Sequence, residues 1–465
     1  MKFFSLKILL SLLLFSASEQ TLAEDSERFD APQFRHVSEA EFSNALPQKD
    51  NHIILMSELR MAACGSAQIE VANASVEVAR AESEITRAEL WPRVTFDINY
   101  LRAERGTKYR GFGSEAHEEG VSSSSELSIS YPIFDGGVLQ ARINSQDAKA
   151  HAEYLARLLV VRDVILKAID LHFKAHETSE LMKVASSNTS LAKELLEIAQ
   201  RRHRLGVGAA VDLDLATTRL RQAELQRVQA ANEFLAARTE LDAFIGRNSV
   251  SEVCRSFAQR PSDPVPYQFP SLEEAVRGIR ESSPSIMVLE KRVQAAQYAV
   301  KAAQRSHFPT VKLIISGSRD ENSKQSGIFG QRTNGMYVGA MASYPLFTGF
   351  ATTKQVEVAV ATLAKQRAEL DQGNIQELTD LDLAYRDIAR YEEELIAARQ
   401  FRIANLSSYD GVKGRFKTGV GNVSNVLLSQ IDFIAALRHE AVAMSRLDRA
   451  RMRLAAMLKG EELLR

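Results

Sequence analysis

The feature that most constrains the fold is a pair of long helical stretches that repeat at a fixed separation. Residues 137–204 carry apolar residues at helical spacing and contain no proline. A single helix of that length would be about 100 Å long at 1.5 Å per residue, which exceeds the width of a compact domain. The stretch ends in Arg202-His-Arg-Leu-Gly206-Val-Gly208, and a matching run, Arg415-Phe-Lys-Thr-Gly419-Val-Gly421, occurs 213 residues later. The chain is therefore a duplication.

The first 23 residues have the features of a secretory signal peptide. Lys2 and Lys7 flank and enter an apolar run over residues 3–15, and small residues follow it. Cleavage is expected after Ala23, with a position near Ser18 as the alternative. A membrane anchor is the alternative, but the run is too short for one. Beyond residue 23 no stretch reaches the roughly 18 apolar residues of a membrane-spanning helix. This leaves a soluble protein, or one that crosses a membrane as a β-barrel.

Composition excludes some classes of partner. The net charge is −1 with 25% charged residues, so nothing indicates a nucleic-acid partner or a polybasic membrane anchor. After the signal peptide, the polar residues 24–56 are expected to form an extended or loosely packed N-terminal arm. The two repeats then cover residues 57–250 and 271–460, and the proline-containing stretch 251–270 is expected to be a linker.

Amphipathic strands are expected in the same place in both repeats. Apolar residues alternate with polar ones most clearly at Val94, Phe96, Ile98 and Tyr100. Shorter alternations occur at 126–131, 311–315 and 338–344, with polar loops expected at 102–124 and 318–334. Strands of about 8–10 residues have the length of tilted membrane-spanning strands. An ordinary half-buried soluble hairpin would show the same alternation.

Four strands per chain cannot close a barrel, and an open sheet edge cannot face lipid. Insertion in a membrane therefore requires several copies in a ring, that is, a homo-oligomer. The aromatic residues at the strand borders would then lie at one level, as at a membrane interface; they are Trp91, Tyr131, Phe308 and Tyr344. The two shorter helices of each repeat, placed end to end, match one long helix in length. We therefore expect an α+β, mainly α protein built from duplicated helix–strand–strand–long helix–helix units.

The turns after the long helices hold candidate functional residues: Gly206, Val207 and Gly208 in the first repeat and Gly419, Val420 and Gly421 in the second. A helix C-cap explains the first glycine of each turn, whereas the second would permit close approach by a partner. The basic residues before the turns, Arg201 to Arg204 and Lys413, Arg415 and Lys417, suit helix C-termini by charge alone.

Polar residues just after the turns allow two interpretations. Asp212 and its counterpart Asn425 could line the narrow end of a ring and favour cations, or they could cap the helices that begin there. For Asp214, capping is the favoured interpretation. Enzyme signatures are missing from the sequence, and no cofactor is expected. His172 and His176 have a metal-binding spacing but no third ligand nearby, which favours packing or surface roles.

Through its paired Tyr-Pro-x-Phe and Arg-x-x-x-Gly-Val-Gly motifs and its duplicated element order, the chain resembles the TolC-like outer-membrane efflux proteins over about residues 60–460. The resemblance implies a homotrimer, with a 12-stranded β-barrel in the outer membrane and an α-helical barrel that crosses the periplasm. It also implies that the helix tips dock on a periplasmic adaptor, or membrane fusion protein. An inner-membrane pump or an ABC transporter for protein secretion would pass the substrate to that adaptor. The six tip residues above would then be the docking residues.

The chain departs from the resemblance in places. Some members have two aspartates after the second turn that form a constriction ring, where this chain has Asn425 and Leu428. Ser271-Leu-Glu-Glu-Ala with Pro284 fits the family's helix start, whereas the first repeat has Cys64 there instead. From the helix lengths, Cys64 and Cys254 would both lie near the middle of the helical layer. A disulfide between them is therefore a hypothesis. The sequence thus predicts a passive, trimeric exit duct, with a soluble periplasmic coiled-coil adaptor as the alternative.

Overall fold

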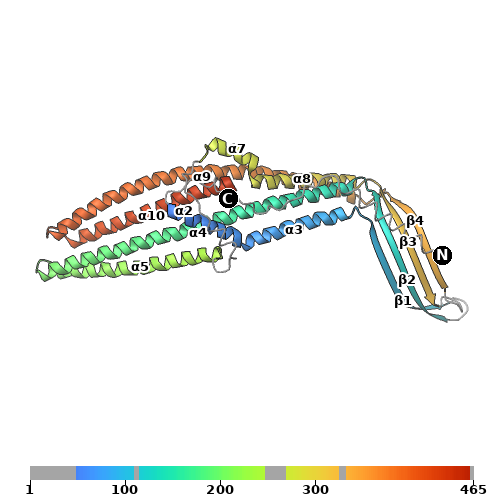
Figure 1. The fold of residues 1–465 in the computed structure, drawn as a ribbon, viewed down its shortest axis with the longest axis horizontal. Coiled ribbons are helices and arrows are strands. Elements are labelled where there is room, and N and C mark those ends of the chain that lie inside the picture. Colours follow the sequence, from blue (N-terminus) through green and yellow to red (C-terminus); the bar gives the residue numbers. More distant parts are fainter. Residues whose placement is uncertain (1–48, 109–114, 247–268, 324–330, 461–465) are drawn as a thin grey trace. The chain divides into compact units, whose positions relative to one another are not determined.

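The computed structural model describes residues 49–108, 115–246, 269–323 and 331–460 as helices and one antiparallel sheet (Figure 1). The first repeat comprises α2 (Lys49–Gly65), α3 (Ala67–Ala88), β1 (Arg93–Lys108), β2 (Glu115–Phe134), α4 (Val138–Arg204) and α5 (Ala210–Phe244). The second comprises α7 (Leu272–Ser282), α8 (Pro284–Arg305), β3 (Thr310–Ser323), β4 (Gln331–Ser343), α9 (Ala351–Lys417) and α10 (Val423–Lys459). The expected signal peptide, most of the arm and most of the linker lie outside the described residues.

The duplication extends to individual helix ends. The long helices α4 and α9 each have 67 residues and are displaced by 213 positions, from Val138 to Ala351. The helices before the strands, α3 and α8, each have 22 residues and are displaced by 217 positions, from Ala67 to Pro284. The hairpin between them is shorter in the second repeat, which accounts for the smaller displacement after the strands. Both long helices match the expected boundaries.

Several expected boundaries are wrong. Helix α2 begins at Lys49, so the last part of the expected arm is helical and buries Leu55 and Met56. The sequence pattern favours one helix over residues 271–305, but this region is divided at Ser283, because Pro284 lacks the N–H that a continuous helix needs. The strands reach farther than the alternation indicated. Much of the loops expected at 102–124 and 318–334 is strand, because ladder hydrogen bonds continue through polar residues.

The helices form a layer in which each long helix is flanked by pairs of shorter ones. α3 packs along the first part of α4 and α5 along the second, as the contacts of Arg157 with Asn73 and of Thr189 with Ala223 show. On its other side α4 contacts α8 and then α10, which both pack against α9. The end-to-end arrangement predicted from helix lengths is therefore confirmed. The largest core cluster lies where α2, α4, α5 and α10 meet.

Within the described residues, no helix combines the length and the apolar character that crossing a bilayer requires.

The sheet has the order β1-β2-β3-β4, so β2 and β3 join the two hairpins and β1 and β4 form its edges. Residues paired across neighbouring strands share a face of the sheet. One row across all four strands consists of Val94, Ile129, Ile315 and Val338. The next row on the opposite face consists of Thr95, Ser128, Ser316 and Tyr337. The register therefore joins the four weak alternations into one apolar face and one mainly polar face.

Candidate functional site at the helix tips

The two long helices end in the same hydrogen-bonded turn. After α4, Gly206 has a φ of 73° and the Val207 N–H donates to the Arg202 carbonyl at 3.1 Å. After α9, Gly419 has a φ of 91° and Val420 makes the corresponding bond at 3.0 Å. This is the Schellman motif, which satisfies the last carbonyls of a helix and favours glycine at the left-handed position. The first glycine of each turn is thus explained as predicted.

The second glycine of each turn has a cause within the chain itself. A Cβ on Gly208 would lie 3.0 Å from the backbone nitrogen of His203, and one on Gly421 would lie 3.0 Å from that of Phe416. The turn folds back onto the helix end so closely that a side chain would crowd it. Close approach by a partner is therefore not needed to explain Gly208 and Gly421.

The turns present apolar side chains to the solvent. Leu205, Val207 and Val420 are 77%, 65% and 81% exposed. Isolated exposed apolar residues are common, but these lie at the ends of helices whose other faces are packed. The tips therefore offer a small apolar surface with basic residues beside it.

One arginine joins the two turns. The Arg202 guanidinium, from α4, donates to the Phe416 carbonyl at 2.8 Å and lies 4.5 Å from the centroid of the Phe416 ring. The Phe416 carbonyl also accepts from the Gly419 N–H at 3.2 Å, so the arginine provides its second hydrogen bond, and the cation interacts favourably with the ring face. Beneath it, Phe416 is fully buried with Val423 and Leu195, so the two hairpins share one small core. The sequence indicated a basic helix end, but not this contact across 214 positions.

An acidic residue on α4 provides a second link between the hairpins. Glu194 accepts hydrogen bonds from Lys413 at 2.5 Å and from Lys417 at 3.2 Å. These bonds hold the pKa of Glu194 below its ordinary value. Burial, together with the charges of Glu194 and Asp410, raises the pKa of the neighbouring Tyr409 to about 12. Tyr409 therefore stays neutral at physiological pH.

Asp212 and Asn425 occupy the same position in the two repeats, in the first turn of α5 and of α10. Neither caps its helix: the N-cap residues are Ala209 and Asn422, and only Asn422 accepts a hydrogen bond, from the Ser424 N–H at 3.0 Å. The capping interpretation of Asp212 and Asn425 is therefore wrong. The carboxylate of Asp212 still favours the positive end of the α5 dipole.

The four aromatic residues at the strand borders lie at the end of the sheet where the strands join the helices. Tyr131 pairs with Leu313 near the start of β3, whereas Trp91, Phe308 and Tyr344 lie just outside the strands at that same end. Their exposed fractions range from 39% to 59%. The register is consistent with a single level for these side chains.

Buried charges hold α2 in place, which the sequence did not indicate. Glu58 is 1% exposed and accepts hydrogen bonds from His172 at 2.7 Å and from Arg238 at 3.0 Å. Burial alone would raise the pKa of Glu58, but His172 and Arg238 outweigh it and hold this pKa below its ordinary value. His172 thus has a packing role.

Near the end of α2, Cys64 is disulfide-bonded. Cys254 lies outside the described residues, so its pairing with Cys64 stays a prediction.

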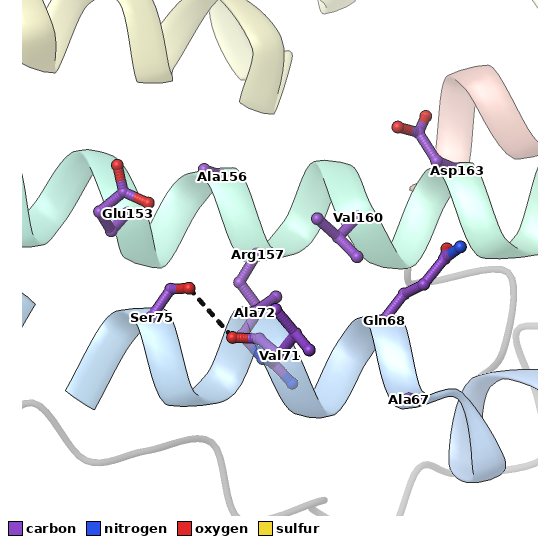
Figure 2. Close-up of a pocket in the computed structure, with 10 residues that line it drawn as sticks. All are labelled: Ala67, Gln68, Val71, Ala72, Ser75, Glu153, Ala156, Arg157, Val160 and Asp163. Atoms are coloured by element: carbon purple, nitrogen blue, oxygen red, sulfur yellow. Dashed lines mark hydrogen bonds between the residues drawn. The ribbon is translucent and has the colours of Figure 1, made fainter. Parts of the chain in front are cut away.

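A groove of about 510 Å³ lies between α3 and α4 (Figure 2). Ala72 and Val160 line it, and the equivalent positions in the second repeat are Leu289 and Gly373. There the Leu289 side chain lies so close that a Cβ on Gly373 would meet it. The groove therefore exists because a small residue on α3 replaces the leucine that fills this place in the second repeat.

Comparison with known proteins agrees with this architecture. The sequence profile of the outer membrane efflux protein family matches residues 59–247 and 276–460, most of both repeats. The chain belongs to the outer membrane efflux protein family. Protein CyaE of Bordetella pertussis is 24% identical over 87% of this chain and 84% of its own length. The outer membrane efflux protein BepC of Brucella suis is 22% identical over 74% of this chain and 72% of its own length.

Solved structures of outer-membrane channels have the same fold. The outer-membrane channel OprN superposes with a TM-score of 0.72 at 20% identity, covering 90% of this chain and 94% of that one. An outer membrane efflux protein resides in the outer membrane and extends into the periplasm, which confirms the expected location. The alternative of a soluble coiled-coil adaptor is therefore wrong. The family and the fold are those of channels.

Proposed function

We propose that three copies of this chain form a passive exit channel, with a 12-stranded β-barrel in the outer membrane and an α-helical barrel in the periplasm. The channel receives its substrate from a periplasmic adaptor and an inner-membrane pump or ABC transporter. In this proposal the chain is a passive conduit and carries out no catalytic chemistry. The partner pump supplies the energy, and the helix tips open to let the substrate pass.

The observation that carries this proposal is that the sheet and the helical layer both end in open edges. Within the described residues, β1 and β4 each pair with a neighbouring strand on one side only. An exposed strand edge on a sheet with an apolar face promotes aggregation unless another strand pairs with it. The helices continuous with these strands expose valines: Val78 of α3 is 59% exposed and Val358 of α9 is 67% exposed. A head-to-tail ring of copies covers both pairs of edges at once.

The test of the channel is its mass and behaviour after extraction from outer membranes. The processed protein in detergent should have three times the mass of one chain by native mass spectrometry. It should also migrate differently in gels before and after boiling. A monomer that stays monodisperse in buffer without detergent would contradict the proposal. Deleting the gene and assaying both antibiotic susceptibility and secreted proteins would show whether small molecules or a protein pass through.

For the tips, we place the adaptor contact on Gly206, Val207 and Gly208 and on Gly419, Val420 and Gly421. The exposed valines support this, because apolar side chains at the end of the helices provide contact area. Changing Val207 and Val420 together to glutamate should abolish transport and cross-linking to the adaptor, while the mass in detergent stays unchanged. The matched control replaces both with isoleucine, which should keep transport.

Asp212 and Asn425 form the proposed periplasmic constriction. Three copies of Asp212 would favour cations, and Asn425 in the equivalent place weakens that preference. Asn425→Asp should shift the reversal potential measured in planar bilayers toward stronger cation selectivity, and Asp212→Asn should shift it the other way. An unchanged reversal potential in both variants would remove these residues from the constriction.

Two further assignments belong to this proposal. The aromatic residues Trp91, Tyr131, Phe308 and Tyr344 mark the membrane interface on the periplasmic side. Cys64 and Cys254 form one disulfide, which ties α2 to the linker before α7. Thiol labelling of the unreduced, denatured protein should find no free thiol, and two labelled cysteines would contradict the pairing.

A further inference from the structure

The duplication preserves strand pairing residue by residue. Val94 of β1 pairs with Ile129 of β2. Helices α3 and α8 are separated by 217 positions, and helices α4 and α9 by 213. Adding 217 to Val94, which follows α3, gives Val311, and adding 213 to Ile129, which precedes α4, gives Ala342. Val311 and Ala342 are paired in β3 and β4. The repeat operation therefore reproduces the register between β3 and β4 without adjustment.

The same operation gives the register of the free edges. Within the chain the hairpins meet through β2 and β3, where Ile129 pairs with Ile315. Moving β2 forward by 213 and β3 back by 217 turns this pair into Ala342 of β4 and Ile98 of β1. We propose that β4 of each subunit pairs antiparallel with β1 of the next subunit in this register, so that Ala342 lies opposite the partner subunit's Ile98. This proposal adds the strand register between subunits to the proposed homotrimeric channel, and it rests on that proposed function.

The faces of the edge strands agree with this register. Ala342 and Ile98 both lie on the apolar face of the sheet, the face of Val94 and Val338. A register shifted by one residue would place the apolar side chains of β1 beside the polar face of β4. The register that the repeat predicts is thus one that continues the apolar face across the subunit boundary.

The helices provide an independent observation. Between α4 and α8, the Ser145 hydroxyl donates to the Ala295 carbonyl at 2.9 Å in a buried contact. Moving α4 forward by 213 and α8 back by 217 turns this pair into Val358 of α9 and Val78 of α3. Both valines are exposed within the single chain, Val358 at 67% and Val78 at 59%, on the helices at the two edges of the layer. The operation therefore places Val358 against the partner subunit's Val78, where each covers the other.

Disulfide cross-linking tests the register. Two chains with different tags are co-expressed, one with Ala342→Cys and the other with Ile98→Cys. A second pair, Ser343→Cys with Asp97→Cys, is included because adjacent antiparallel pairs alternate between the close and the wide spacing. We expect a covalent heterodimer carrying both tags after mild oxidation of purified outer membranes. Each cysteine variant alone should give none.

Shifted pairs provide the matched control. Ala342→Cys combined with Val94→Cys or with Arg102→Cys keeps the same face but moves the partner by about 13 Å along the strand, beyond disulfide reach. Cross-linking of a shifted pair in place of the predicted one would overturn the register. A trimeric mass without cross-links from either predicted pair would also overturn it, while the channel proposal stands. A monomeric mass would overturn the channel itself.

Val78→Cys with Val358→Cys tests the helical contact separately, outside the membrane, where changes in the strands have no direct effect. A heterodimer from this pair is the expected result. Failure of this pair in a trimer that cross-links through the strands would overturn the helical part of the assignment.

Discussion

The two repeats are alike in the lengths that set the geometry and different in the side chains that fill it. Helices α4 and α9 have equal lengths, as do α3 and α8, and the two hairpins share one register. Equivalent side chains nevertheless differ in size and charge, as Ala72 and Leu289 do. A ring in which hairpins alternate around one axis needs matching lengths, because a mismatch would misalign every following element. Individual contacts are free to diverge when their neighbours compensate.

A half-buried carboxylate in the second repeat gives the largest expected difference in stability between a variant and the wild type. Asp448 of α10 is equivalent to Leu235 of α5, and burial raises the pKa of Asp448 to about 6, with Arg451 opposing the shift. The folded state therefore favours protonated Asp448. Its contribution to stability is complete below about pH 4 and is lost as the pH rises to about 6, a difference of up to about 3 kcal/mol at 1.36 kcal/mol per pKa unit.

Asp448→Asn should therefore melt at a higher temperature than the wild type at pH 8, with the two curves meeting near pH 4. Thermal melting of the detergent-solubilised protein across this range measures the effect. Asp382→Asn on α9 is a suitable control, because Asp382 lies in an exposed ion pair with Arg386 and should contribute little. Equal melting temperatures of wild type and Asp448→Asn at pH 8 would contradict the expectation.

The arginines before the two turns form the second contrast. Arg202 of the first repeat donates to the Phe416 carbonyl, whereas its equivalent Arg415 makes no such contact within the described residues. Arg202→Ala should weaken the contact between the two tips of one chain by about 1.5–3 kcal/mol, the range for a hydrogen bond to a charged group. Channels with this change should open more often in planar bilayers. Arg415→Ala should leave the opening frequency close to that of the wild type, and equal effects of both changes would contradict the asymmetry.

The groove between α3 and α4 suggests an exchange of side chains between repeats. Gly373→Val gives α9 the residue that α4 has at Val160, and it should destabilise the protein by about 1–3 kcal/mol through overpacking against Leu289. Adding Leu289→Ala, which completes the first repeat's combination, should recover part of this loss. A double-mutant cycle of melting temperatures measures the coupling. Purely additive effects would show that the two side chains do not compensate each other.

Local patterns in the sequence predict the features that depend on local chemistry. The ends of α4 and α9 and the glycine at each turn could be predicted because a helix terminator acts on its own neighbours. The division at Ser283 follows from Pro284, which is visible in the sequence. It was nevertheless missed, because the helical periodicity continues on both sides of the proline and favours one continuous helix. The outer halves of the strands could not be predicted from alternation, because their side chains are polar on both faces.

Features that depend on elements meeting in space are the ones that the sequence did not reveal. The Arg202 contact joins helix ends that are hundreds of residues apart, and the crowding at Gly208 depends on how the turn folds back. The ion pairs of Glu58 also require α2 to be placed against α4 and α5. Each of these needs the packed helices before it can be recognised.

The smallest expected difference concerns the helices that begin after the turns. Asn422 caps α10 through the Ser424 N–H, whereas its equivalent Ala209 provides no cap to α5. Asn422→Ala should lower stability by about 1 kcal/mol, and Ala209→Asn should raise it by a similar or smaller amount. Melting temperatures of the two variants measure this, with Ala209→Ser as a second capping residue. If Asn422→Ala lowers the melting temperature and neither capping variant at position 209 raises it, the start of α5 is held by packing rather than by its cap.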